Sequence, residues 1–173
     1  MRTAYRLRTA AFFAICAASS GMATTVVAQV PTTPPPANPA QGMNVAAPAD
    51  SIKWGPAPAV FPPGAQVAVL QGDPQAAGQI FTVRLRMPDG YIIPAHSHPT
   101  DEHVTVIRGT LLIGMGDRFA ESALKPLNAG GFISAPAGMN HFVKASGETE
   151  VQVHAMGPFA MTYANPADAP SGN

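Results

Sequence analysis

Short strand-like runs separated by turn residues limit what this chain can fold into more than any other feature. Between about residues 50 and 167, apolar or alternating runs recur, and glycine, proline, asparagine or aspartate interrupts them. The run from Gln79 to Met87 alternates apolar and polar residues, as a half-buried strand does. Turn signals this frequent favour an all-β sandwich or barrel. We therefore expect a single all-β domain over residues 50–167.

Composition narrows the class of protein. Hydrophobic residues make up 46% of the 173 residues, which excludes wholesale disorder. Charged residues make up only 12%, and the ten Lys and Arg are balanced by the ten Asp and Glu, whereas a nucleic-acid surface needs an excess of clustered positive charge. We therefore expect no nucleic-acid partner. The single cysteine cannot form a disulfide within the chain.

The N-terminus has the pattern of an export signal. Three arginines lie within the first eight residues, residues 10–18 form an apolar run, and Val-Val-Ala28 offers a small-residue cleavage site. We expect residues 1–28 to be a signal peptide cleaved near Ala28, which would leave a periplasmic or secreted protein. The alternative is an uncleaved membrane anchor, because residues 9–30 carry no charge.

The segments that flank the predicted domain differ from it in composition. Residues 29–49 are rich in proline, with alanine, threonine, asparagine and glutamine between the prolines. Such a stretch favours an extended, disordered linker, because it has too little apolar surface to offset its ordering entropy. Residues 168–173 are predicted to be a short C-terminal tail.

Three histidines and one glutamate form a candidate metal site. His96 and His98 lie two residues apart, so on a strand they project to the same side. Glu102 opens the next run after a proline turn, and a Pro-x-Gly turn precedes His141. These turns could bring all four side chains to one point. Three neutral nitrogens and one carboxylate suit a divalent Fe, Mn, Ni, Cu or Zn ion, and these residues do not choose among them.

Two spaced motifs give the chain a resemblance to the cupin superfamily. The first cupin motif, G-x5-H-x-H-x3-E-x6-G, is matched at Gly90, His96, His98, Glu102 and Gly109. The second, G-x5-P-x-G-x2-H-x3-N, is matched at Gly130, Pro136, Gly138 and His141, but Ala145 stands where the family has asparagine. The resemblance implies a single-domain cupin, with a double-stranded β-helix (jelly roll) from about Ile52 to Tyr163 and one metal inside it.

The resemblance also limits the functions to be considered. Together with the export signal, it implies an exported metalloprotein that acts on a small organic molecule. The resemblance implies dioxygenase-like chemistry first, isomerase and hydrolase-like chemistry stay open, and Glu102 could also shuttle a proton. A metal centre with one glutamate is formally positive and favours an anionic or enolisable ligand. Two alternatives stay open: a non-enzymatic metal or ligand sensor, and a structural metal in an oligomeric barrel. Cupins often dimerise through sheet edges, so a homodimer is a further expectation.

Three other residues are candidates for the lining of the pocket. Gln152 and His154 share one face of a strand-like run, and Val151 and Val153 share the other. We expect the polar pair to point inward, because a second sheet could cover the valines. Tyr91 directly follows a turn and could reach the mouth of the cavity.

Several charged residues are expected to point outward. His103 follows Glu102, so if the glutamate points inward the histidine points outward. Arg84 and Arg86 alternate with apolar residues and are expected to be solvated, whereas an inward Arg84 would indicate an anionic ligand. Glu150 lies near a turn and is expected to be a solvated charge.

Overall fold

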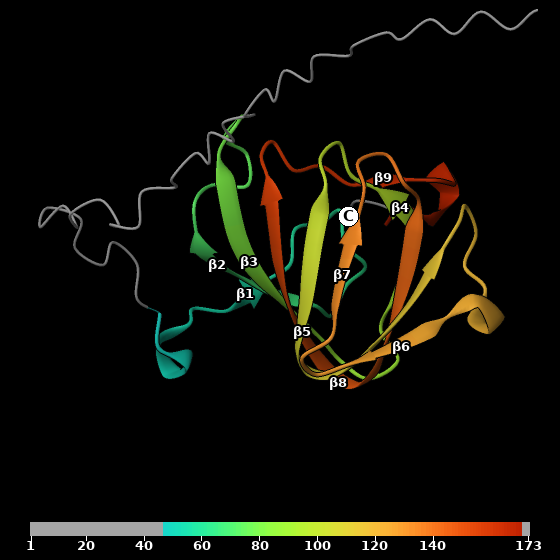
Figure 1. The fold of residues 1–173 in the computed structure, drawn as a ribbon, viewed down its shortest axis with the longest axis horizontal. Helices are drawn as coiled ribbons and strands as arrows, with labels where there is room; N and C mark the ends of the chain where they lie inside the picture. The colour runs from blue at the N-terminus through green and yellow to red at the C-terminus, as the bar shows by residue number, and fades with distance from the viewer. Residues whose placement is uncertain (1–46, 171–173) are drawn as a thin grey trace, which may run out of the picture. The chain divides into compact units, whose positions relative to one another are not determined.

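Nine strands, all paired antiparallel, build residues 47–170, the part of the chain that the computed structural model describes (Figure 1). The strands are β1 (Gly55–Pro56), β2 (Gln66–Gln71), β3 (Ile80–Met87), β4 (Ile92–Ser97), β5 (Glu102–Met115), β6 (Lys125–Asn128), β7 (Phe132–Ala135), β8 (His141–Met156) and β9 (Thr162–Tyr163). Three 3-10 turns accompany them, at Ala49–Ser51, Glu121–Ala123 and Pro166–Asp168. The predicted all-β class is confirmed.

Some predicted segments cannot be compared with this structure. The signal peptide predicted over residues 1–28 lies outside the described residues, as do most of the predicted linker and the last three residues of the predicted tail. Within residues 47–170, no helix has the length and apolar character to cross a membrane.

The two longest strands, β5 and β8, pair with each other twice and curl the sheet into a jelly roll. The first half of β5 and the second half of β8 lie beside β3 and β7, whereas the other two halves lie beside β4 and β6. Both strands bend at a glycine with positive φ, Gly109 at 76° and Gly147 at 71°. A Cβ on Gly109 would lie 2.5 Å from the carbonyl oxygen of Glu148, so only glycine fits this crossing.

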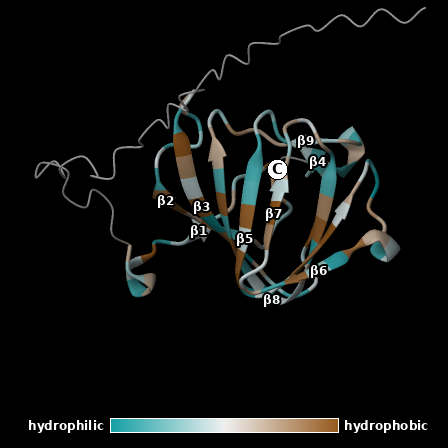
Figure 2. Ribbon diagram, viewed as in Figure 1, coloured by the Kyte–Doolittle hydropathy of each residue, from teal (hydrophilic) through white to brown (hydrophobic). Residues whose placement is uncertain are grey.

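Alternation along the strands divides each one into an inner and an outer face. In β3, Phe81, Leu85 and Met87 are buried in the interior, while Arg84 and Arg86 point the other way and stay partly exposed. Figure 2 shows hydrophobic and hydrophilic residues following one another along the strands. The inner faces together form an apolar interior between the two groups of strands.

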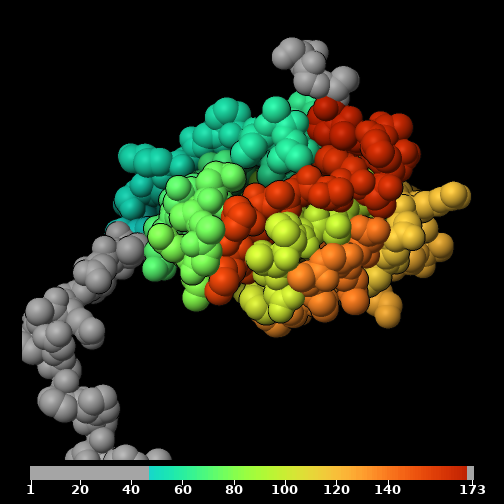
Figure 3. Space-filling model, turned by 90° about the horizontal axis from the view of Figure 1, so that it is seen from above, coloured from blue at the N-terminus to red at the C-terminus, as the bar shows by residue number. Residues whose placement is uncertain are grey.

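The C-terminal segment closes one end of the barrel. The hydroxyl of Tyr163 in β9 donates a hydrogen bond to the carbonyl of Val60 at 2.7 Å, and the backbone N–H of Phe159 donates to the carbonyl of Pro74, also at 2.7 Å. Figure 3, which looks onto this end, shows the segment in red between the blue-green N-terminal part and the middle of the chain. The loops around residues 60, 74 and 159 therefore meet at this end.

Candidate metal centre

Three histidines meet inside the barrel, as their spacing predicts. His96 lies in β4 and pairs in register with His141, the first residue of β8, while His98 directly follows β4. All three are buried, at 2–5% exposure. The three histidines can each offer a ring nitrogen to a common point, since these atoms lie within 4.8 Å of one another.

The backbone fixes the orientation of each imidazole. The Nδ1 atoms of His96 and His141 lie 2.7 and 3.1 Å from the carbonyl oxygens two residues earlier, those of Pro94 and Met139. The Nδ1 of His98 lies 2.8 Å from the carbonyl oxygen of Ala160. A carbonyl only accepts, so each Nδ1 carries the proton and donates it. Each Nε2 is left with a free lone pair, the arrangement in which histidine binds a metal.

Glu102, the first residue of β5, lies beside two of the three histidines. Its Oε1 lies 3.7 Å from the Nε2 of His98, and its Oε2 lies 3.4 Å from the Nε2 of His141. The residue is 9% exposed. The structure therefore brings together all four residues that the sequence singled out, with the carboxylate on the side of His98 and His141.

The protonation of these four groups reflects their burial and their mutual charges. Burial, assisted by the neighbouring His141, lowers the pKa of His96 to about 3. Burial also lowers the pKa of His98, although Glu102 opposes this. Burial acts to raise the pKa of Glu102, but the contacts with His141 and His98 outweigh it and lower that pKa.

His141 differs from the other two histidines. Burial acts to lower its pKa, but the adjacent Glu102 carboxylate outweighs this and raises it. The imidazole and the carboxylate thus each favour the charged form of the other.

One buried atom shows how well the site suits a cation. The Nε2 of His98 is buried and makes no hydrogen bond to any described residue. A buried nitrogen without a partner costs free energy, and coordination to a metal would remove that cost. Three imidazole nitrogens and one carboxylate are also a donor set that divalent transition metals favour. The residues present fit such an ion.

An apolar cavity of about 360 Å³ extends from the histidines into the barrel. Its walls are mainly valine, leucine, isoleucine and methionine side chains of β2, β3, β4, β5 and β8. Val60, Pro74, Phe159 and Met161 line it as well, from the loops that meet at one end of the barrel. The candidate metal site therefore faces a space large enough for a small organic molecule.

The prediction that Gln152 and His154 point into this cavity is wrong. Val151 and Val153 line it, whereas Gln152 and His154 point to the outer face of β8. The outer pair bonds to β3 instead: the Nδ1 of His154 lies 3.0 Å from the Thr82 hydroxyl, and Gln152 accepts a hydrogen bond from Arg84. The inner face is the apolar one because it closes the interior of the barrel.

Tyr91 does not line the cavity either. It is 7% exposed, packs in the core, and its hydroxyl donates a hydrogen bond to the carbonyl of Pro62. Its role is to hold the segment before β2 against the barrel.

Of the charged residues expected to point outward into solvent, His103 confirms the prediction and Glu150 does not. His103 points outward as expected, where its ring stacks on Phe132 at 6.1 Å between centroids. Glu150, by contrast, is not a solvated charge: it is 8% exposed and bridges Arg84 and Arg86 at 3.0 and 3.2 Å. Arg84 thus lies outside the cavity and its charge is compensated there.

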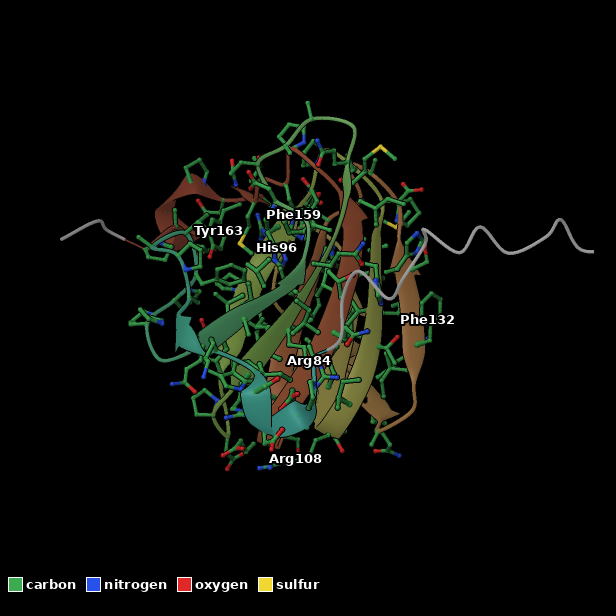
Figure 4. All side chains as sticks on the ribbon, turned by 90° about the vertical axis from the view of Figure 1, so that its left-hand side faces the viewer. Arg84, His96, Arg108, Phe132, Phe159 and Tyr163 are labelled. Carbon is green, nitrogen blue, oxygen red and sulfur yellow. The ribbon has the colours of Figure 1, made fainter. Side chains whose placement is uncertain are left out.

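Sequence reasoning missed Phe159. Its ring stacks on the imidazole of His98, with centroids 4.2 Å apart and planes at 18°, and contacts Phe81 edge to face at 5.1 Å. Figure 4 shows Phe159, His96 and Tyr163 together near one end of the barrel, with Arg84 and Arg108 away from them. No local pattern indicates this role, because Phe159 lies in a loop placed by distant contacts.

Comparisons with known proteins agree with this fold. Residues 43–160 match the protein family described as the ChrR cupin-like domain. A putative acetylacetone dioxygenase from Methylibium petroleiphilum PM1 has a TM-score of 0.55 at 21% identity, over 71% of this chain and 82% of that one. An RmlC-like cupin from Shewanella frigidimarina NCIMB 400 has a TM-score of 0.51 at 13% identity, over 68% of this chain and 94% of that one. No curated protein sequence matches the chain.

Proposed function

The chain belongs to the ChrR cupin-like domain family, and from this premise we propose that it is a metalloprotein that acts on a small organic molecule. His96, His98 and His141 would hold one divalent transition metal, and Glu102 would complete the ligand set. The observation that carries the proposal is that three backbone carbonyls fix all three Nδ1 protons, which leaves three Nε2 atoms for one ion.

The cavity favours chemistry over a purely structural metal. A structural site is usually closed by protein ligands, whereas this one faces about 360 Å³ of apolar space. When bound, a divalent transition metal with open positions can act as a Lewis acid or bind dioxygen. This supports a dioxygenase-like reaction, with isomerase chemistry as the other activity of the same site.

The residues around the site have separable roles in this proposal. The carbonyl of Ala160 and the ring of Phe159 orient His98. The Oε2 of Glu102, 3.4 Å from the Nε2 of His141, is placed to hold a proton when it is not bound to the metal. The valines of β8 exclude water from the inner part of the cavity.

The first test is the metal content of the purified protein. We expect near-stoichiometric Fe, Mn, Ni, Cu or Zn by elemental analysis without added metal, and loss of it in His96→Ala and His141→Ala. The matched control is His103→Ala, because that histidine lies on the outer face of the same sheet and should leave the metal content unchanged. Absence of metal even after reconstitution would refute the proposal.

Catalysis is tested separately from metal binding. We expect the metal-loaded protein to consume oxygen with a phenolic or enolic compound, and the ligand variants to lose this activity. A metal-loaded protein without turnover of any such compound would support the alternative, a non-enzymatic sensor.

Two further proposals concern the assembled protein. We propose that it is exported after cleavage near Ala28, which the mass of the mature chain would test. We also propose a homodimer, and light scattering on the purified protein would test that.

A further inference from the structure

The wall of the cavity contains almost no polar side chains. Apart from the three histidines and Glu102, every residue that lines it is apolar except Gln75, which is exposed. Because the cavity is built from the inner faces of strands, the same alternation that makes it apolar sends the polar side chains outward. A molecule bound there meets hydrocarbon everywhere except at the metal site and around Gln75.

No arginine or lysine of residues 47–170 lines the cavity. Arg84 and Arg86 belong to β3, a strand that lines the cavity, but they lie on its outer face and are paired with the buried Glu150. Among the described residues no cationic side chain faces a bound molecule, so the positive charge would come from the metal. One divalent ion with one glutamate has a formal charge of +1, which a single monoanionic group would neutralise.

Resting on the proposed metal centre, we propose that the site selects a molecule with one anionic, oxygen-donor head and an apolar tail. The head lies at His96, His98 and His141, and the tail lies against the valines and leucines of β3 and β8. A second charge on the tail is excluded, because it would be buried without a partner. Sugars and dicarboxylates are thereby rejected as ligands, while short apolar acids, enols and phenols are accepted.

Two hydroxamates of equal length test this selection. Hexanohydroxamate and the monohydroxamate of adipic acid share the same metal-binding head and differ only at the far end, a methyl group against a carboxylate. Calorimetry on the zinc-loaded full chain would give both dissociation constants. We expect the alkyl compound to bind about a hundredfold tighter or more, because an unpaired buried carboxylate costs at least the equivalent free energy.

A pair of nearly isosteric variants locates the effect in the cavity. Val153→Thr places a hydroxyl on the cavity wall, and we expect it to weaken hexanohydroxamate binding about tenfold. Thr105→Val makes the reverse change on the outer face of β5, where the side chain is partly exposed, and should leave binding unchanged. Both variants should bind zinc as the wild type does.

The outcomes separate this inference from the proposed function. If the protein binds zinc but takes both hydroxamates equally well, or takes neither, the selection is refuted and the metal centre stands. A chain that takes up no zinc overturns the metal centre and the selection with it, and this is established from metal content before any ligand is added. Equal effects of the two variants would also contradict the inference.

Discussion

The metal-free protein should lose stability in mild acid because of His96. Its ordinary pKa of 6.5 falls to about 3 in the folded chain, chiefly through burial. Below pH 6.5 the His96 imidazole is therefore protonated in the unfolded chain, whereas in the folded chain it stays neutral until the pH is near 3. A depressed histidine pKa gives stability that is present above pH 6.5 and lost as the pH falls toward 3.

The size of this loss follows from the two pKa values. Each pH unit inside the window costs about 1.4 kcal/mol per proton, so between pH 7 and pH 5 the loss from His96 is about 2 kcal/mol. The lowered pKa of His98 adds a loss of the same sign. The raised pKa of His141 acts in the opposite direction, since its contribution is present at low pH and lost as the pH rises through the folded pKa.

A variant isolates the contribution of His96 from the others. Urea denaturation of chelator-treated protein at pH 7 and pH 5 gives the loss for the wild type and for His96→Gln, which cannot titrate. We expect the loss to be about 2 kcal/mol smaller in the variant. Comparing each protein with itself at two pH values removes the cost of the substitution. Equal losses in both proteins would refute the reasoning.

Three further predictions concern the metal, the outer charges and a close contact. Chelation should lower the melting temperature measured by scanning fluorimetry, because a metal at about a thousand times its dissociation constant stabilises the folded state by about 4 kcal/mol. An unchanged melting temperature would exclude a stabilising metal. Glu150→Gln should lower the free energy of unfolding by about 2 kcal/mol in urea denaturation, since Arg84 and Arg86 lose the carboxylate that they share at 3.0 and 3.2 Å. The metal content should not change, and a loss of metal would mean that the outer face supports the metal site. Gly114→Ala should cost about 2 kcal/mol or more, because the new Cβ would lie 2.3 Å from the ring of Phe142; a variant as stable as the wild type would show that the ring can move.

The histidines could be predicted because local geometry places them. The two-residue spacing of His96 and His98 puts both on one face of an extended segment, and a turn before His141 returns the chain to them. The bonds that orient His96 and His141 are also local, since each ring is held by the carbonyl two residues before it. Sequence spacing therefore determines most of the positions of the three histidine rings.

Which face of β8 points inward could not be predicted in the same way. Alternation shows that Val151 shares a face with Val153, and Gln152 with His154, but it does not show which face meets the interior. That depends on β3, more than sixty residues earlier, whose polar side chains bond to the outer pair. The burial of Glu150 was missed for the same reason, because its two arginine partners are also in β3.

The register between β3 and β8 determines both the polar contacts on the outer face of these strands and the apolar character of the cavity. Shifting β3 by one residue against β8 would break the bonds of Arg84 to Gln152 and Glu150 and the contact of Thr82 with His154. The same shift would turn polar side chains of β3 toward the metal site, because side chains alternate with a period of two. Bonds on the outside of the barrel thus keep charge out of its inside. The residues that determine the apolar character of the cavity therefore include ones that never contact its contents.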